Sequence, residues 1–241
     1  MSRKLLTRSL SATIAIAAIG AAWSVSAAAS PRTSAPVFDS TNFVAVVDNT
    51  YFPLPVGRTL VYSGIKDGQT QRDVVTVTNQ TKVILGVTAT VVSDVADHDG
   101  TILERTSDWY AQDEQGNVWY LGEDTVHYLP NGKGDTSGSW EAGVNGAQAG
   151  IIMEANPQIP DAYRQEFLAR EAEDTAWIVN LGGVVSVPYG KVRNVLTTLE
   201  ATRLEPGAYD QKVYGPGIGI VLEQSLTGDP EVARLESVTG P

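Results

Sequence analysis

The sequence contains no cysteine and only two histidines, and its 17 basic residues are outnumbered by 28 acidic ones. The absence of cysteine excludes disulfide bonds, thiolate metal sites and catalysis by a thiol. The two histidines, His98 and His127, do not have the spacing of a metal-binding pair. From the residue types present we therefore expect no metal site and no cofactor.

The first 29 residues have the three parts of a secretory signal peptide. Arg3, Lys4 and Arg8 form a positively charged start. A small and apolar run over 12–22 follows, and residues 26–29 offer the small side chains that signal peptidase needs. The run is too short for a bilayer core of roughly 30 Å. We therefore expect this segment to be cleaved and the protein to be secreted or otherwise extracytoplasmic.

Without these 29 residues the 241-residue chain keeps 212 residues, of which 14 are basic and 28 acidic, so that its net charge is −14. Such a surface repels phosphate backbones and anionic lipids, and no basic stripe offsets it, so nucleic acid is not expected as a partner. The mature chain has no second apolar run long enough to cross a membrane. The simplest role of the charge is to keep an exported protein soluble.

The mature chain is interpreted as a flexible lead over 30–40, rich in Ala, Ser, Thr and Pro, and a single β-rich domain over 41–241. Short runs of Val, Ile, Thr, Tyr and Trp between turn residues indicate strands. The expected strands are 59–63, 71–79, 82–85, 88–96, 102–112, 118–121, 176–179, 184–187, 192–203, 211–214, 218–224 and 232–238.

Two stretches do not fit a simple row of strands. The range 129–160 is rich in glycine and is expected to be irregular. The range 161–174 has the Ala, Glu and Arg content of a short helix, with Tyr163 and Phe167 one helical turn apart. Short turns join most of the other segments, which favours antiparallel pairing. The sequence thus predicts an all-β fold, or a β-rich fold with a short helix, made of one antiparallel curved sheet or open barrel.

Two turns, over 97–100 and 113–116, have Asp first and Gly fourth, which is typical of a three-residue hairpin loop with a bulge. The register that they imply pairs Val95 with Leu103, Trp109 with Leu121 and Ala111 with Trp119. One face of the sheet then carries Ala89, Val91, Val95, Leu103, Trp109, Ala111, Trp119 and Leu121. The opposite face carries Asp94, Glu104, Thr106, Asp108, Tyr110, Gln112 and Tyr120.

Candidate ligand-binding residues lie where these two hairpins meet. They are Trp109, Trp119 and Leu121 on the apolar face, with Tyr110 and Tyr120 on the same two strands. A strongly curved antiparallel sheet of this size often encloses a ligand cavity. The alternative is that these side chains only pack in the core, which is their commoner use.

Three acidic residues near this block are candidate catalytic carboxylates: Asp108, Glu123 and Glu141. Enzymes that cleave sugars use carboxyl pairs roughly 5–10 Å apart. The alternative is a solvated sheet face on which acidic side chains meet by chance, since 28 of them are present. The sequence does not decide whether the protein is an enzyme.

The range 108–123 resembles a block, DWYAQDxxGNVWYxGE, of a group of uncharacterised secreted bacterial proteins, and stretches within 138–153 and 204–219 fit the same group. No activity is attached to that group, so the resemblance implies no catalytic residues. The pattern from Tyr214 through Gly217, Gly219 and Val221 to Glu223 is similar to the last hairpin of curved-sheet envelope proteins of the lipoprotein-carrier type. Those proteins hold acyl chains in a half-barrel, which implies an apolar ligand.

Three functions remain open at this point. The first is non-catalytic binding of an apolar or amphipathic small molecule outside the cytoplasm. The second is an extracytoplasmic hydrolase, glycan-directed, that uses Asp108 with Glu123 or Glu141. The third is an envelope interaction protein without a small-molecule site, which would expose an apolar patch of roughly several hundred Å².

Overall fold

The computed structural model describes residues 37–66, 68–228 and 230–241. The predicted signal peptide and residues 30–36 of the predicted lead lie outside this part of the chain. The described residues form strands, turns and bridges but no helix, and hence none that is long and apolar enough to cross a membrane.

Sixteen strands make up the described fold. They are β1 (Phe43–Val44), β2 (Thr59–Lys66), β3 (Gln69–Ile84), β4 (Val87–His98), β5 (Thr101–Asp113), β6 (Val118–Tyr128), β7 (Gly134–Asp135), β8 (Trp140–Glu141), β9 (Gln148–Met153), β10 (Ala162–Arg164), β11 (Glu166–Phe167), β12 (Asp174–Val187), β13 (Gly190–Thr202), β14 (Asp210–Gly215), β15 (Gly219–Ser225) and β16 (Val232–Thr239). The range expected to be irregular therefore contains β7, β8 and β9. Two pairs of predicted segments are single long strands, β3 and β12.

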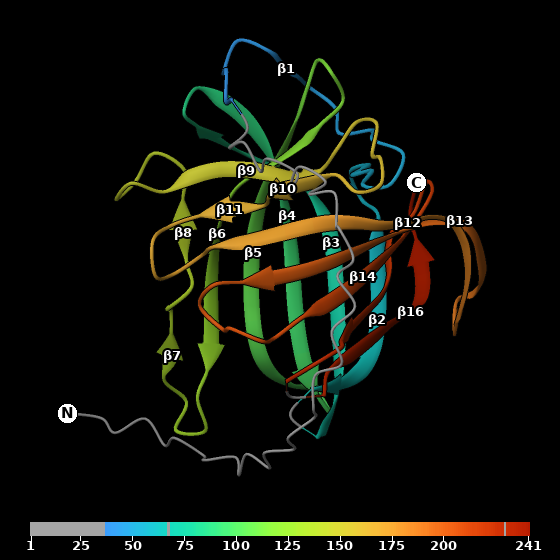
Figure 1. The fold of residues 1–241 in the computed structure, drawn as a ribbon. Helices are drawn as coiled ribbons and strands as arrows, with labels where there is room; N and C mark the ends of the chain where they lie inside the picture. The colour runs from blue at the N-terminus through green and yellow to red at the C-terminus, as the bar shows by residue number, and fades with distance from the viewer. Residues whose placement is uncertain (1–36, 67, 229) are drawn as a thin grey trace, which may run out of the picture. The chain divides into compact units, whose positions relative to one another are not determined.

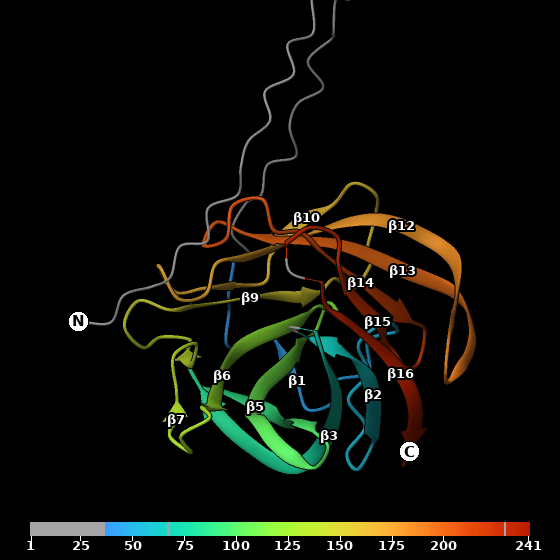
Figure 2. The ribbon, with the colours of Figure 1, turned by 90° about the horizontal axis from the view of Figure 1, so that it is seen from below.

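Thirteen of these strands follow one another in an antiparallel sheet in the order β10-β12-β13-β14-β15-β16-β2-β3-β4-β5-β6-β9-β11, while β1 pairs with β5 and both β7 and β8 pair with β6. The sheet curls until its two ends approach each other (Figures 1 and 2). The end strands β10 and β11 are consecutive in the chain and are separated by Gln165 alone. One short segment therefore pairs first with β12 and then with β9, and the barrel is nearly closed, with one unsealed seam. The predicted antiparallel curved sheet or open barrel is confirmed.

The predicted short helix over 161–174 is wrong, because this segment joins the two edges of the sheet. Tyr163 is buried and lies opposite Ala176 of β12. Across the seam, Gly150 of β9 comes so close that a Cβ atom there would overlap the carbonyl groups of Arg164 and Gln165. Edge strands that meet this closely fix an extended backbone, which outweighs the modest helix propensity of the segment.

The first of the two hairpins has a tighter turn than predicted. Asp99 and Gly100 both have positive φ angles, 50° and 81°, as in a two-residue turn of type I′. The predicted pairing of Val95 with Leu103 is therefore wrong, and Val95 lies opposite Arg105. The shorter turn accounts for one residue of this difference, and a β-bulge at Leu103, between the pairs Asp97–Ile102 and Ala96–Glu104, accounts for the other.

The second hairpin has the predicted register near its turn, where Ala111 lies opposite Trp119. A register shift follows after Trp109, which lies opposite Gly122. The predicted pairing of Trp109 with Leu121 is therefore wrong, because Leu121 is the extra residue of a β-bulge. The residue pairs on both sides of the bulge remain antiparallel.

The outer side of β5 and β6 is covered by the segment that leads into the barrel. The ring of Trp119 makes edge contacts with Phe38 and Phe43, at centroid distances of 5.4 Å and 6.1 Å. Its indole Nε1 donates a hydrogen bond to Asp113 Oδ2 at 2.9 Å. Contacts with the barrel therefore begin at Phe38, within the segment predicted as a lead.

Candidate functional site

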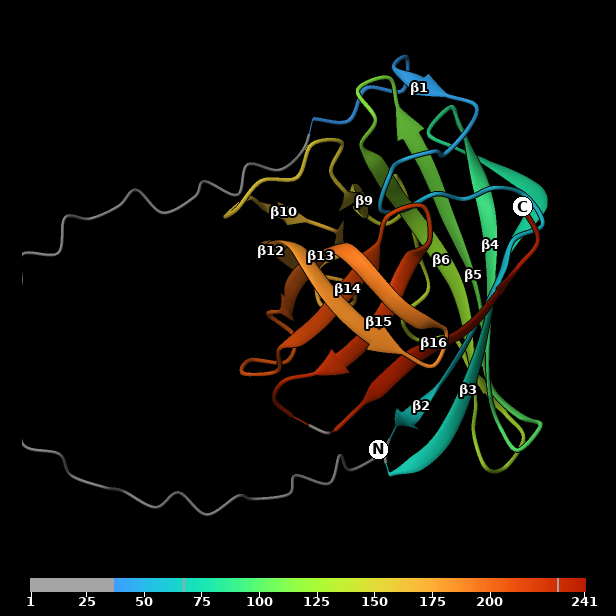
Figure 3. The ribbon, with the colours of Figure 1, turned by 90° about the vertical axis from the view of Figure 1, so that its right-hand side faces the viewer.

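A cavity of about 140 Å³ lies inside the barrel, between strands that are far apart in the sequence. Strands β2 to β5 contribute to its lining from one side and β14 and β15 from the other. Figure 3 shows these two groups of strands facing each other. Its apolar wall is made by Phe52, Leu54, Leu60, Val75, Val92, Ile152, Ile218 and Ile220. Its polar side chains are Tyr62, Asp94, Asp108, Tyr110, Lys212 and Tyr214. The sheet face that carries Asp94, Asp108 and Tyr110 is thus the concave one, and the alternative of a solvated face does not hold for them.

A row of aromatic rings extends from the cavity along the inner side of β5 and β6. Tyr110 makes an edge contact with Phe52 at 5.0 Å and is stacked on Tyr120 at 4.8 Å, between ring centroids. Tyr120 in turn contacts the edge of Trp140 at 5.2 Å. Tyr62 is fixed from the opposite side, since its hydroxyl donates to the carbonyl of Ile220 at 2.9 Å. Such contacts hold the rings in defined positions, so this wall is preformed.

Asp108 lies beside this aromatic row, next to Tyr120. The hydroxyl of Tyr120 donates a hydrogen bond to Asp108 Oδ1 at 2.7 Å. Burial raises the pKa of Asp108 to about 6, although the bond from Tyr120 acts in the opposite direction. A carboxyl with a pKa in this range is mostly ionised at neutral pH and accepts further donors.

Asp94 is the second acid of the cavity, two residues after Val92 on β4. Its Oδ1 atom is buried and has no hydrogen-bond partner. Burial, and then the charge of Asp108, raise the pKa of Asp94 well above its usual value. A buried carboxyl oxygen without a donor is uncommon in a folded protein, because its lost hydration is not replaced.

Lys212 of β14 is the base that faces these acids. Its Nζ atom lies 2.9 Å from Glu200 Oε2 and 3.7 Å from Glu223 Oε1. Burial opposes the charge of the ammonium group, but the two glutamates outweigh it and hold the pKa of Lys212 well above its usual value. The ammonium group is therefore ion-paired with Glu200 and Glu223.

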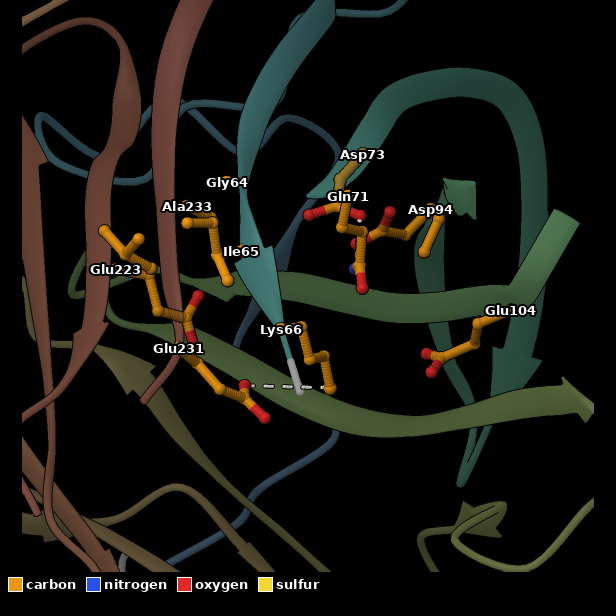
Figure 4. A pocket seen from close by; sticks show the side chains of 12 residues that line it. Gly64, Ile65, Lys66, Gln71, Asp73, Asp94, Glu104, Glu223, Glu231 and Ala233 are labelled. Atoms are coloured by element: carbon orange, nitrogen blue, oxygen red, sulfur yellow. Dashed lines mark hydrogen bonds and ion pairs between the residues drawn. The ribbon is translucent and has the colours of Figure 1, made fainter. Parts of the chain in front are cut away.

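A second cavity, of about 270 Å³, adjoins the first at Asp94 and is distinctly acidic. Asp73, Asp94 and Glu104 line one side of it, and Glu223 lines the other (Figure 4). Lys66 also lines this cavity and is ion-paired with Glu231 at 3.8 Å. Burial raises the pKa of Asp73 and that of Glu223. The barrel interior thus contains a largely apolar cavity and, next to it, an acidic one.

Glu123 completes the acidic set on β6. It lies directly opposite Asp108, and opposed residues of an antiparallel pair point to the same side of the sheet. Burial, and then the charge of Asp108, raise the pKa of Glu123 to about 8. The structure therefore brings together two of the three predicted carboxylates, and it makes one of them mainly neutral and the other mainly ionised at neutral pH.

The third predicted carboxylate, Glu141, lies opposite Gly122 on the neighbouring strand β8 and shares a hollow with Glu123 but not with Asp108. Its Oε2 atom lies 2.7 Å from Lys82 Nζ, and that ammonium group also sits 3.3 Å from the ring centre of Trp109. Together with Glu123 and Trp140 these residues line an open hollow of about 310 Å³. Glu141 is thus neutralised by a lysine, whereas Asp108 lines the central cavity.

The five predicted ligand-binding residues lie on both sides of the sheet. Tyr110 lines the central cavity and Tyr120 stacks on it, whereas Trp109 lines the open hollow. Trp119 is covered by aromatic side chains, and Leu121 is fully buried at the bulge. The curvature of the sheet explains this division, since the face with more polar residues is the concave one.

The sequence did not indicate four residues of this site: Asp94, Tyr62, Lys212 and Tyr214. Asp94 could have been predicted as a site residue, because it lies two residues after Val92 on the same strand and therefore on the same face of the sheet as Val92 and Asp108. The other three are contributed by strands whose neighbours are set only when the sheet curls. Among the described residues, no group of three or more His, Asp or Glu side chains is arranged to hold a metal ion.

No protein-family model and no curated protein matches the chain. Two solved structures are similar. One, from Bacteroides fragilis and described as an exported protein with a YmcC-like fold, has a TM-score of 0.46 and 15% identity, over 80% of this chain and 100% of that one. The other, from Parabacteroides distasonis and described as a lipoprotein, has a TM-score of 0.41 and 11% identity, over 79% and 99%. At these values neither similarity assigns a function to this chain.

Proposed function

We propose that the mature chain works outside the cytoplasm as a non-catalytic binding protein, and that it holds an apolar or amphipathic small molecule in the central cavity of the barrel. The location is supported by the signal-peptide pattern of residues 1–29. The observation that carries the binding proposal is the cavity itself, which has an apolar wall and polar groups at one end. This combination is typical of small-molecule sites.

The size of the cavity limits what fits in it. A protein cavity of roughly 150 Å³ lined by apolar side chains holds a benzene molecule, and the central cavity has about 140 Å³. The apolar part of the ligand is therefore about as large as a single ring. Tyr110 and Tyr120, from the predicted set, contribute to this site together with Val92 and Ile220.

Benzyl alcohol is a suitable first probe because it is a single ring with a small polar group. A ligand that binds only the folded state raises the unfolding temperature. We expect benzyl alcohol to raise the melting temperature of the mature chain and to change its tyrosine fluorescence. The variant Val92→Phe, which places a ring in the cavity, should lose both effects.

The matched control is Val83→Phe, since Val83 is 67% exposed on β3. It should respond to benzyl alcohol like the wild type. Equal responses of the wild type and Val92→Phe would show that the probe binds elsewhere, and the absence of any response would refute the proposal.

A hydrolase is the second candidate, and the pairing of Asp108 with Glu123 favours it. Two neighbouring carboxyls with pKa values of about 6 and about 8 can act as base and acid at neutral pH. Turnover of a panel of nitrophenyl glycosides would support this function, provided that Asp108→Asn and Glu123→Gln each abolish it. Turnover that survives in both variants would reject it.

A further inference from the structure

The charges of the central cavity do not balance. Asp94 and Asp108 both line it, on neighbouring strands, and Asp94 lies diagonally across from Asp108. Lys212, the base of the same cavity, is held by Glu200 at 2.9 Å and by Glu223 at 3.7 Å. Among the described residues, neither Asp94 nor Asp108 has a basic side chain within ion-pair distance. The cavity therefore presents two acids that this part of the chain leaves without a cation.

Of the two acids, Asp94 is the one that lacks a hydrogen-bond donor. Asp108 already accepts a hydrogen bond from Tyr120, whereas Asp94 Oδ1 is buried and has no donor. The cavity on the other side of Asp94 adds the acids Asp73, Glu104 and Glu223. Its donors, Lys66 and Gln71, interact with Glu231 and Asp73 (Figure 4). A buried acceptor without a donor is costly, so a donor supplied from outside the chain stabilises it.

We propose that the molecule held in the central cavity carries a primary amine, whose ammonium group binds at Asp94 and Asp108 while its apolar part lies against Val92 and Ile220. This inference rests on the binding function proposed above and adds the chemical class of the ligand. An ammonium group has three donors and no acceptor, and it forms charge-assisted hydrogen bonds to carboxylates. A carboxylate or phosphate ligand would instead face several acids.

Proton release should accompany the binding of an amine. A bound cation favours the ionised form of Asp94, whose pKa is raised in the empty cavity by burial and by Asp108, so that binding lowers this pKa and expels a proton. Affinity should then rise with pH until Asp94 is ionised in the empty cavity as well. The titratable groups around Asp94 come from every strand that packs on it: Asp73 on β3, Glu104, Asp108 and Tyr110 on β5, Glu223 on β15, Tyr62 and Lys66 on β2, Lys212 on β14, and Glu231 just before β16.

The test compares three probes of nearly equal size by titration calorimetry on the mature chain: benzylamine, benzyl alcohol and benzoate. We expect benzylamine to bind about tenfold more tightly than benzyl alcohol, as a charge-assisted hydrogen bond would give, and benzoate to give no binding heat. Asp94→Asn should abolish the preference for benzylamine, so that benzylamine and benzyl alcohol bind to this variant with equal affinity. The matched control is Asp124→Asn, an exposed position on β6 that should behave like the wild type.

The outcomes separate the two proposals. If benzyl alcohol binds and benzylamine binds no better, the amine inference fails while the binding function stands. If no probe binds, both fail. If the preference for benzylamine survives in Asp94→Asn, the ammonium group binds elsewhere and the inference is wrong. Should Asp94→Asn not fold, the wild type decides the matter alone: the heat of benzylamine binding must depend on the ionisation enthalpy of the buffer, and a buffer-independent heat overturns the inference.

Discussion

Replacement of Lys212 by methionine tests whether this side chain offsets the acids of the barrel interior. The variant keeps most of the aliphatic volume and removes the ammonium group that lies 2.9 Å from Glu200. Glu200 is only 5% exposed, so its carboxylate would stay buried without its partner. Removal of one member of a buried ion pair destabilises a protein by about 3–5 kcal/mol. We expect a loss of that order in the free energy of unfolding.

The matched control is Arg203→Met. Arg203 lies 2.7 Å from Glu173, a contact as short as that of Lys212, but its side chain is 81% exposed. The Arg203 guanidinium stays in contact with water, so its removal should cost much less than that of Lys212, and the two variants differ in burial and not in distance. Urea denaturation at neutral pH, followed by tryptophan fluorescence, gives both free energies of unfolding.

The double variant Lys212→Met with Glu200→Gln, compared with the two single variants, completes a double-mutant cycle. It removes the stranded charge and should recover a large part of the lost stability, because a neutral amide costs less to bury than a carboxylate. The reasoning is refuted if Lys212→Met destabilises the protein no more than Arg203→Met, or if the second substitution adds to the loss.

Three further predictions concern the same interior and its seam. Because burial raises the pKa of Glu123 to about 8, above its value of 4.5 in the unfolded chain, its contribution to stability is present below about pH 4.5 and is lost as the pH rises to about 8; urea unfolding across this range should show a smaller decline for Glu123→Gln than for the wild type. Tyr120→Phe removes the donor to Asp108 and should lower the free energy of unfolding by about 1.5–3 kcal/mol, measured in the same way, and an unchanged value would mean that the bond at 2.7 Å is not formed. Gly150→Ala places a methyl group against the backbone of Arg164 and should destabilise the protein by about 1–3 kcal/mol, with hydrogen exchange increased first at the seam; protection that is lost uniformly would contradict a local effect.

Each strand and turn of the sheet is specified by residues that lie close together in the sequence, which is why the sequence predicts most of the strands. Runs of β-branched and aromatic residues between turn signals indicate the strands, and the pairing of Ala111 with Trp119 follows from one turn. The 97–100 turn has the Asp and Gly of a three-residue loop, but positive φ at Asp99 makes it a two-residue one. The bulge at Leu121 has one signal in the sequence, Gly122, a glycine inside β6 with a φ of 135°.

The inner and outer faces of the barrel could not be assigned from polarity. The face with Trp109 and Trp119 is more apolar, and it is nevertheless the outer one, covered by Phe38 and by Lys82. The face with Asp108 is inside because the sheet curls around acids that Lys212 only partly neutralises. Long-range closure of this kind depends on strand order, which no local pattern contains.

The central claim is that the barrel interior holds a small molecule, and native mass spectrometry of the exported protein tests it most directly. The mature chain and its Val92→Phe variant would be purified by the same route and measured before and after denaturation. We expect a reproducible extra mass on the wild type, which leaves on denaturation and is absent from Val92→Phe. A wild-type spectrum that shows only the mass of the bare chain, or an extra mass that Val92→Phe retains, would contradict it.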